Sequence, residues 1–295
     1  MTPVTTLALL SKKNDLSARL FFRYWRDVHG VLAARIPGFE TYTQFHLGAV
    51  VRNLALPNHV SRSWPVAARF HGLAEVGFLS PAAREGLINS KVAALIQADE
   101  RNLFKTSLLY NLEPGASRSY HSRPASAGSV GFVMLLGLRT GHNPRELIDT
   151  VERWLIPALS ADPVIHGLHM HVLSSGDPSQ WRTAGVDNQQ STATTFEAVL
   201  RIEGLDSQLT LDSIKGACAL GHPHDYEALG RLHLYRIDDR HVMVENGQPT
   251  HLGLRGLDAL QTITLAGADL QLQRAVTRTL YGTSPPARKR KKMGV

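Results

Sequence analysis

Cysteine is almost absent from this chain: Cys218 is the only one among 295 residues. A single thiol cannot form a disulfide within the chain, and this is typical of proteins kept in a reducing compartment such as the cytoplasm. Cys218 lies in the apolar stretch 216–220. We therefore expect it to be a small buried hydrophobe rather than a nucleophile.

Long hydrophobic runs are also missing. No stretch approaches the ~18 apolar residues that cross a bilayer. The apolar start, residues 1–10, has no basic leader and no small-residue cleavage site. It predicts a first strand instead of a signal peptide, so we expect a cytoplasmic protein with no membrane partner.

Several motifs of common enzyme classes are absent. No Gly-x-Gly-x-x-Gly follows a predicted strand, and neither a phosphate-binding Gly-Lys-Ser/Thr loop nor a Gly-x-Ser-x-Gly elbow occurs. Their absence disfavours nicotinamide, ATP and serine-hydrolase chemistry.

Positive charge is concentrated at one end. The formal net charge is +7, and residues 288–292 supply five of these charges, which leaves +2 (7 − 5) for the rest. We expect the basic tail, 285–295, to be disordered. The body shows no basic stripe interleaved with aromatic residues, so no specific nucleic-acid partner is expected.

The order of predicted elements repeats. The predicted order in each half is strand, helix, strand, strand, helix, strand. The spacing of apolar residues predicts the type of each element, and Ser, Asn and Pro residues mark where helices begin. Strands are predicted at 5–11, 39–51, 70–79 and 105–112, and again at 130–138, 167–174, 196–202 and 231–237. Helices are predicted at 17–35, 82–104, 144–159 and 209–229, and a further helix near 268–280. The resulting divisions are 1–116, a linker at 117–129, a second unit at 130–245, an extension at 246–284 and the tail.

This order predicts an α+β fold of two tandem ferredoxin-like units. Two such sheets placed face to face would form an α+β barrel with a central cavity, within one chain as a monomeric pseudo-dimer or in a homodimer. Residues 39–51 alternate as a strand does, and we expect Tyr42, Gln44 and His46 to point into that cavity.

Four separated blocks resemble the EthD family over about residues 5–113. They are Phe22-x-Tyr24-Trp25-x-x-x-His29, Pro37-Gly38-x-x-x-Tyr42-x-x-x-His46, the stretch 70–78, and Asp99-Glu100-x-x-x-Phe104. The second half lacks the Tyr-Trp-x-x-x-His block and looks like a degenerate unit. The resemblance implies a dimeric α+β barrel, a superfamily that includes cofactor-free isomerases, cyclases and decarboxylases, monooxygenases and haem enzymes. It does not fix a reaction.

The candidate catalytic residues are histidines and tyrosines of these blocks. Imidazoles suit proton transfer near neutral pH, which makes His29 and His46 candidate acid–base groups. Tyr24 and Tyr42 are candidates to donate a hydrogen bond to a developing enolate oxygen. Structural roles remain the alternatives. His29 would then be a histidine that bonds the backbone at a helix end, and Tyr42 and His46 would be interior polar side chains with no catalytic role.

Other residues are expected to bind the substrate or, less favoured, a metal. Trp25 and Gln44 lie beside the catalytic candidates, and His71 and Glu75 share a predicted strand face where they could pair. His169 and His171 form a His-x-His that could hold a divalent metal, although no carboxylate motif completes the site. Haem is the other alternative cofactor, but the Gly-x-x-Asp-Gly signature of dye-decolourising peroxidases is absent.

The sequence thus favours a cofactor-independent enzyme acting on a small aromatic or polyketide-like carbonyl substrate. The reaction would be cyclisation, isomerisation, dehydration or decarboxylation. Two alternatives stay open: a non-catalytic small-molecule-binding barrel, and a haem- or metal-dependent oxidoreductase of the same superfamily.

Overall fold

A computed structural model describes residues 3–122, 130–174, 181–190 and 195–282 of the chain. Most of the predicted linker and the whole basic tail lie outside these ranges. Within them, every helix is too short or too polar to cross a membrane.

The first unit has the predicted order, and short capping side chains begin its helices. Ser17, Ser80 and Ser90 each accept a hydrogen bond from a backbone N–H in the first turn of the helix that follows. The elements are β1 (Val4–Lys12), α1 (Ala18–Tyr24), the π-helical turn η1 (Trp25–His29), α2 (Gly30–Ala33), β2 (Phe39–Val51), η2 (Val66–Ala68), β3 (Gly72–Phe78), α3 (Pro81–Glu85), η3 (Gly86–Asn89), α4 (Lys91–Leu103) and β4 (Phe104–Asn111).

The second unit repeats this order. Its first helix begins with a capping box made by Asn143 and Glu146. The elements are β5 (Ser117–Ser122), β6 (Val130–Leu138), α5 (Pro144–Arg153), α6 (Leu155–Ser160), β7 (Ile165–Val172), β8 (Ala198–Gly204), α7 (Ser207–Ala219), η4 (Pro223–Tyr226) and β9 (Leu229–Glu245). The predicted linker therefore begins with a strand, β5, which pairs antiparallel with β7.

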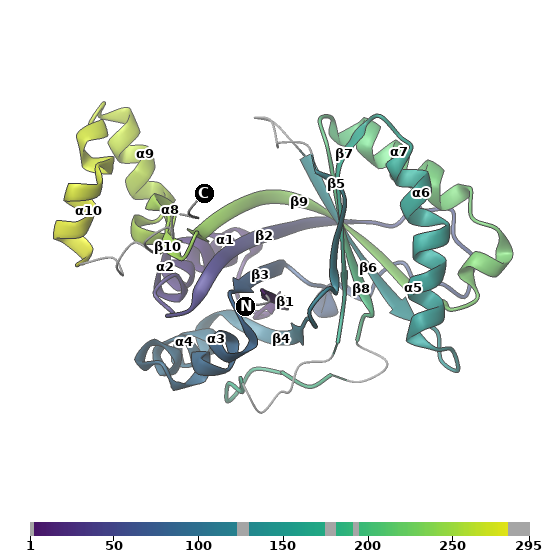
Figure 1. Cartoon of the computed structure of the whole chain (residues 1–295), viewed down its shortest axis with the longest axis horizontal. Coiled ribbons are helices and arrows are strands. Elements are labelled where there is room, and N and C mark those ends of the chain that lie inside the picture. The colour runs from purple at the N-terminus through teal and green to yellow at the C-terminus, as the bar shows by residue number, and fades with distance from the viewer. Residues whose placement is uncertain (1–2, 123–129, 175–180, 191–194, 283–295) are drawn as a thin grey trace, which may run out of the picture.

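The two units share one curled antiparallel sheet. The strand order is β4-β1-β3-β2-β9-β6-β8-β7-β5, so each unit keeps the ferredoxin-like order and the units join where β2 pairs with β9. Helices cover the outer faces: α1 to α4 lie over the first half, and α5 to α7 over the second (Figure 1). The predicted α+β fold of two tandem ferredoxin-like units is confirmed.

The space between the two half-sheets is filled rather than hollow. Side chains from both units, including Leu7, Phe45, Leu135 and Tyr235, pack there into one buried cluster. For the described residues the prediction of a central cavity is therefore wrong, because large apolar side chains of both sheets occupy its place. Two further clusters lie between each half-sheet and its own helices.

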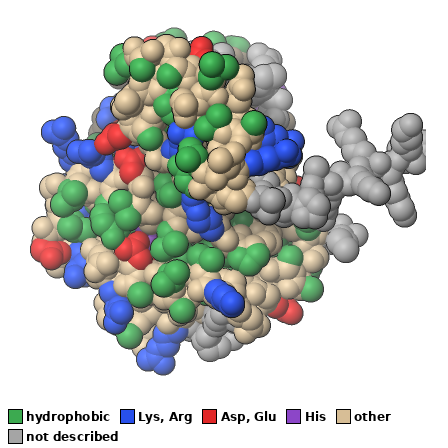
Figure 2. Space-filling view, turned by 90° about the vertical axis from the view of Figure 1, so that its left-hand side faces the viewer, with side chains coloured by type: hydrophobic (Ala, Val, Ile, Leu, Met, Phe, Trp, Pro, Cys, Tyr) green, Lys and Arg blue, Asp and Glu red, His purple; other side chains and the backbone are tan. Residues whose placement is uncertain are grey.

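The C-terminal extension packs on the first unit. It consists of β10 (Gln248–Pro249), α8 (His251–Arg255), α9 (Leu257–Leu265), η5 (Asp269–Leu272) and α10 (Arg274–Tyr281). The helix predicted near 268–280 corresponds to η5 and α10. On the face that carries these helices, basic and acidic side chains are dispersed among apolar ones (Figure 2).

Candidate active site

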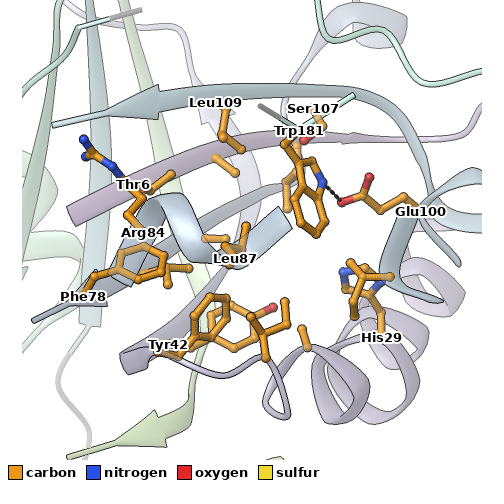
Figure 3. A pocket seen from close by; sticks show the side chains of 18 of the residues that line it. Thr6, His29, Tyr42, Phe78, Arg84, Leu87, Glu100, Ser107, Leu109 and Trp181 are labelled. Atoms are coloured by element: carbon orange, nitrogen blue, oxygen red, sulfur yellow. Dashed lines mark hydrogen bonds between the residues drawn. The ribbon is translucent and has the colours of Figure 1, made fainter. Parts of the chain in front are cut away.

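A cavity of about 210 Å³ lies between the sheet of the first unit and its covering helices. Small side chains on the helix-facing side of the sheet leave this space open, among them Thr6 and Ala8 of β1 and Ala74 of β3. The lining is mostly apolar, with a few polar groups that converge on it. Figure 3 shows His29, Tyr42, Glu100 and Trp181 around this space. Such a combination is typical of small-molecule sites.

The π-helical turn η1 places two residues at the cavity, Trp25 and His29. The backbone N–H of Gly30 bonds the carbonyl of Trp25, closing a wider turn than in an α-helix. Gly30 is needed because a Cβ there would lie 2.4 Å from the side chain of Gln44. Gly72 likewise leaves room for the Trp25 ring, which would lie 2.5 Å from a Cβ. The helix therefore packs closely on the sheet at the site.

His29 is oriented by a carboxylate. Its Nδ1 lies 3.0 Å from Oδ2 of Asp99, and the hydroxyl of Tyr24 donates to Oδ1 of Asp99 at 2.5 Å. Burial alone would raise the pKa of Asp99, but the hydrogen bonds from His29 and Tyr24 outweigh it and hold that pKa below its usual value. With Nδ1 directed at an ionised carboxylate, Nε2 is the nitrogen left to meet a ligand in the cavity.

Tyr42 lines the same cavity and is held by Gln44. The amide nitrogen of Gln44 donates to the Tyr42 hydroxyl oxygen at 2.8 Å and to the backbone carbonyl of Trp25 at 3.0 Å. Burial raises the pKa of Tyr42 above its usual value. The phenol therefore stays protonated at neutral pH, and its O–H is available as a hydrogen-bond donor.

Glu100 is a buried carboxyl at the cavity wall, only 5% exposed. It accepts hydrogen bonds from Nε1 of Trp181, at 2.8 Å, and from the hydroxyl of Thr183. Burial raises the pKa of Glu100, although these hydrogen bonds and the nearby His29 act against the rise. The carboxyl thus fixes the indole of Trp181 over the cavity.

Trp181 comes from the second unit, although the cavity belongs to the first. Its segment continues along the open edge of β4, where Ser107 donates its N–H to the carbonyl of Asp187 and Asp187 donates to the carbonyl of Lys105, both at 2.9 Å. The side chain of Asn188 also donates to the carbonyl of Ser107, at 3.0 Å. The second unit therefore completes the wall of the first unit's cavity.

The face predicted for β2 is reversed. Phe45 lies in the cluster between the sheets, so Tyr42, Gln44 and His46 face the helices instead. Tyr42 still reaches a cavity, but His46 is fully buried against Phe22 and Trp25 and does not line it. The predicted alternation of side chains along β2 was correct. Both faces of this strand are buried, however, so the alternation does not show which face lies against the helices.

Other predicted site residues lie in different places. Tyr24 and Gln44 do not line the cavity. Tyr24 donates a hydrogen bond to Asp99, and Gln44 donates one to Tyr42. Glu75 faces the second unit, where Arg201 donates to it at 2.6 Å. His71 lies before β3, near the backbone N–H of Lys12, and does not pair with Glu75. Strand β3 turns its odd-numbered side chains away from the helices, which explains why Glu75 misses the cavity.

The pair proposed as an alternative metal site has other partners. Nδ1 of His169 and Nδ1 of His171 bond the hydroxyls of Ser119 and Ser117, at 2.5 and 3.0 Å. The guanidinium of Arg201 lies nearby and helps to lower the pKa of His169 to about 4, after the larger effect of burial. Within the described residues no group of three ligands forms around this pair.

Four residues of the site were not among the predicted site residues. Asp99 and Glu100 belong to the last of the resembling blocks, and their adjacency was the signal available. Trp181 and Thr183 lie in the long polar loop that follows the second of the strands predicted for the second unit, at 167–174. Nothing in their spacing indicates that they contact the first unit.

Comparison with known proteins supports the resemblance. Residues 13–107 match the family model of the EthD domain. No curated protein sequence matches the chain significantly. The resemblance is thereby confirmed for the first unit.

Solved structures show weaker likenesses. One is a proposed monooxygenase from Lactobacillus acidophilus, with 10% identity and a TM-score of 0.44, covering 84% of this chain and 98% of that one. Another, from Fusobacterium nucleatum, has 6% identity, a TM-score of 0.49 and coverages of 84% and 96%. An anthrone oxidase-like protein has 10% identity, a TM-score of 0.48 and coverages of 82% and 94%. Likeness at this level carries no argument about activity.

Proposed function

We propose that this chain, whose residues 13–107 form an EthD domain, is an enzyme that moves protons on a small aromatic or polyketide-like carbonyl compound. One observation carries the proposal: the Asp99–His29 pair meets an apolar cavity that Tyr42 also lines. An apolar cavity of about 150 Å³ holds benzene. The space of about 210 Å³ therefore suits a substituted single ring or a short chain of similar size.

The first step is removal of a proton next to the carbonyl group. Nε2 of His29 takes the proton, the C–H electron pair moves to form the enolate, and negative charge develops on the carbonyl oxygen. Asp99 stabilises the imidazolium, since its lowered pKa keeps it ionised. Tyr42 donates a hydrogen bond to the enolate oxygen, which a phenol with a raised pKa can do without losing its proton.

The second step returns the proton. The imidazolium of His29 delivers it to another atom of the substrate or to a departing hydroxyl, which gives isomerisation or dehydration. Attack of the enolate on a second carbonyl of the same molecule forms the new C–C bond, and the imidazolium then protonates the resulting alkoxide, which gives cyclisation. The cavity holds the reacting groups together and excludes water. Glu100 is a positioning residue, because it fixes the Trp181 indole over the substrate.

A first experiment combines ligand retention with proton exchange. Native mass spectrometry of the purified chain would identify a retained compound, and a panel of aryl ketones and 1,3-diketones in D₂O would report deuterium uptake by NMR. His29→Gln should lower exchange or turnover by about 10²–10⁴-fold. His224→Gln removes an exposed imidazole of the second unit and should change nothing.

Two results would contradict the mechanism. If His29→Gln exchanged protons as fast as the unsubstituted chain, His29 would not be the base. If compounds bound tightly but neither exchanged nor reacted, the chain would be a carrier that uses the same cavity for binding alone. Ligand affinity and the melting temperature of His29→Gln show whether the variant keeps its fold.

A further inference from the structure

Three potential ligands converge where the two units join. In the pairing of β2 with β9, His46 lies opposite Asp239, and Gln44 lies opposite His241. Residues two apart on a strand share a face, so His241 lies beside Asp239 on the side of His46. One ligand atom from each of the three residues lies within 4.8 Å of the others. This convergence is separate from the cavity that His29 lines.

Two nitrogens of this group are buried and have no hydrogen-bond partner in the part of the chain that the structure describes. His46 is fully buried, and its Nδ1 meets no hydrogen-bond partner among the described residues. The same holds for Nε2 of His241, a residue only 8% exposed. Leaving a buried polar atom unpaired costs about 1–3 kcal/mol. The centres of the two imidazole rings lie 4.6 Å apart, so a single ion bound by both nitrogens would satisfy both atoms.

Gln44 sets the tautomer of His46. Its amide nitrogen is committed to Tyr42 and to the carbonyl of Trp25, so its oxygen faces Nε2 of His46, at 3.4 Å. Nε2 must therefore carry the proton, and Nδ1 presents a lone pair. A second ring nitrogen bonded to an amide oxygen or a carboxylate is the usual support of a metal-binding histidine.

We propose that His46, Asp239 and His241 bind a divalent transition-metal ion such as Zn²⁺ at the seam between the two units. Two imidazoles and one carboxylate are ligands that this class of ion accepts. On a tetrahedral Zn²⁺ the ligand atoms would lie about 3.3 Å apart. Asp239 is exposed, and the proposed site requires its carboxylate to turn toward the two imidazoles.

The local charge permits a cation. The guanidinium of Arg26 is close, but Asp27 accepts two hydrogen bonds from it, at 2.8 and 2.6 Å, and balances its charge. The carboxylate of Asp239 then leaves the group with a negative charge.

The ion would keep open positions on one side. Asp239 also lines an open depression together with Arg19 and Arg23 of α1, Arg26 of η1 and residues of α9. Three protein ligands leave room for water or another ligand on Zn²⁺.

Metal titration tests the site directly. The full chain, stripped with a chelator and dialysed, would be titrated with Zn²⁺ by calorimetry and with Co²⁺ by visible absorption. We expect one ion per chain and a rise in the melting temperature on binding. Asp239→Asn keeps the shape of an exposed side chain, and it should weaken binding by at least about 10-fold and alter the Co²⁺ spectrum.

A second variant and a control complete the design. His241→Asn should weaken binding as Asp239→Asn does. His222→Asn with His224→Asn removes another pair of neighbouring imidazoles, whose ring centres lie 5.7 Å apart; this double variant should bind as the unsubstituted chain. Absence of binding to the unsubstituted chain would overturn the proposal. So would unchanged binding by both site variants, or loss of binding in the control.

Discussion

The two units share one fold but differ in the space beneath their helices. On the helix-facing side, β1 carries Thr6 and Ala8, whereas β6 carries Phe132 and Met134. The side chains of β6 fill the second unit and belong to a continuous buried cluster. The small side chains of β1 leave the cavity of the first unit. The size of a few side chains, rather than the arrangement of strands, therefore decides which unit can hold a ligand.

The third strand of each unit repeats the contrast. Helix-facing Ala74 and Val76 of β3 line the cavity, whereas Leu200 and Ile202 of β8 are fully buried in the second core. The second unit nevertheless contributes to the site, because Trp181 covers the first unit's cavity. The first unit thus has an open cavity beneath its helices, whereas the second has a filled core and supplies one wall of that cavity.

A large-to-small substitution in the core of the second unit tests whether tight packing is what distinguishes this unit from the first. Met134→Ala removes a fully buried side chain of the second core. We expect it to lower the free energy of unfolding by about 2–5 kcal/mol, measured by chemical denaturation. Met134→Leu keeps the volume and should cost less than about 1.5 kcal/mol. A loss below about 1 kcal/mol for Met134→Ala would show that this core is not tightly packed.

The converse change is a small-to-large substitution that fills part of the first unit's cavity. Ala8 lines the cavity with its single methyl group, and Ala8→Met adds three heavy atoms at that place. Because a ligand would then have to displace the new side chain at a cost of about 1–3 kcal/mol, affinity should fall by about 5- to 150-fold. Native mass spectrometry of the retained compound and circular dichroism measure binding and folding. Ala8→Ser serves as a control of nearly unchanged size; if Ala8→Met kept full affinity, the ligand would lie elsewhere.

An ion pair in the inter-sheet space links the two units. Burial would raise the pKa of Glu75, but Arg201 and then His171 hold it at about 2, below the usual 4.5. A depressed carboxyl pKa adds stability above the unfolded value, and this stability is lost as pH falls from about 4.5 to 2. The contribution is of order 2–3 kcal/mol.

Glu75→Gln should therefore destabilise the chain most at neutral pH, and the difference from the unsubstituted chain should shrink toward pH 2. Denaturation curves between pH 7 and 2 would measure it. The matched control is Glu152→Gln, which breaks a more exposed ion pair with Arg118 within the second unit. This change should cost less than about 1 kcal/mol. A constant difference at every pH would mean that Glu75 does not titrate with a depressed pKa.

Much of the fold was predictable because local patterns agree with it. The bounds of the strand predicted at 39–51 and of the one at 130–138 are those found in the structure. The helix starts at Ser80 and Asn143 followed from capping chemistry. The break of the first helix into a π-helical turn was not predictable, since it depends on the contact of Gly30 and Trp25 with β2 and β3.

The site was predictable only in part, because it depends on distant contacts. His29, Tyr42 and Trp25 do line the cavity, and the family-like blocks contained all three. The faces of β2 could not be assigned, since helices bury one face and the other half-sheet buries the other. The contact between Trp181 and Glu100 joins residues 81 positions apart. No pattern of neighbouring residues encodes such a contact.

The smallest expected effect comes from removing one tyrosine–carboxylate hydrogen bond in the first unit and comparing it with a similar bond in the second. Tyr24→Phe removes the donor to Asp99 but keeps the ring, and the loss of one such bond is worth about 0.5–1.5 kcal/mol, or about 2- to 12-fold in turnover. Because this bond helps to hold the pKa of Asp99 down, its loss should raise that pKa. The proposed mechanism needs ionised Asp99, so activity should disappear at a higher pH on acidification.

The control for Tyr24→Phe lies in the second unit. The hydroxyl of Tyr120 donates to Glu152 at 2.6 Å, so Tyr120→Phe removes a similar bond to a carboxylate far from the cavity. Profiles of kcat/KM against pH for both variants would show the difference. Only Tyr24→Phe should move the acidic limb to higher pH, because only its carboxylate orients His29. Equal profiles for the two variants would mean that Tyr24 supports the fold of the first unit and has no part in proton transfer.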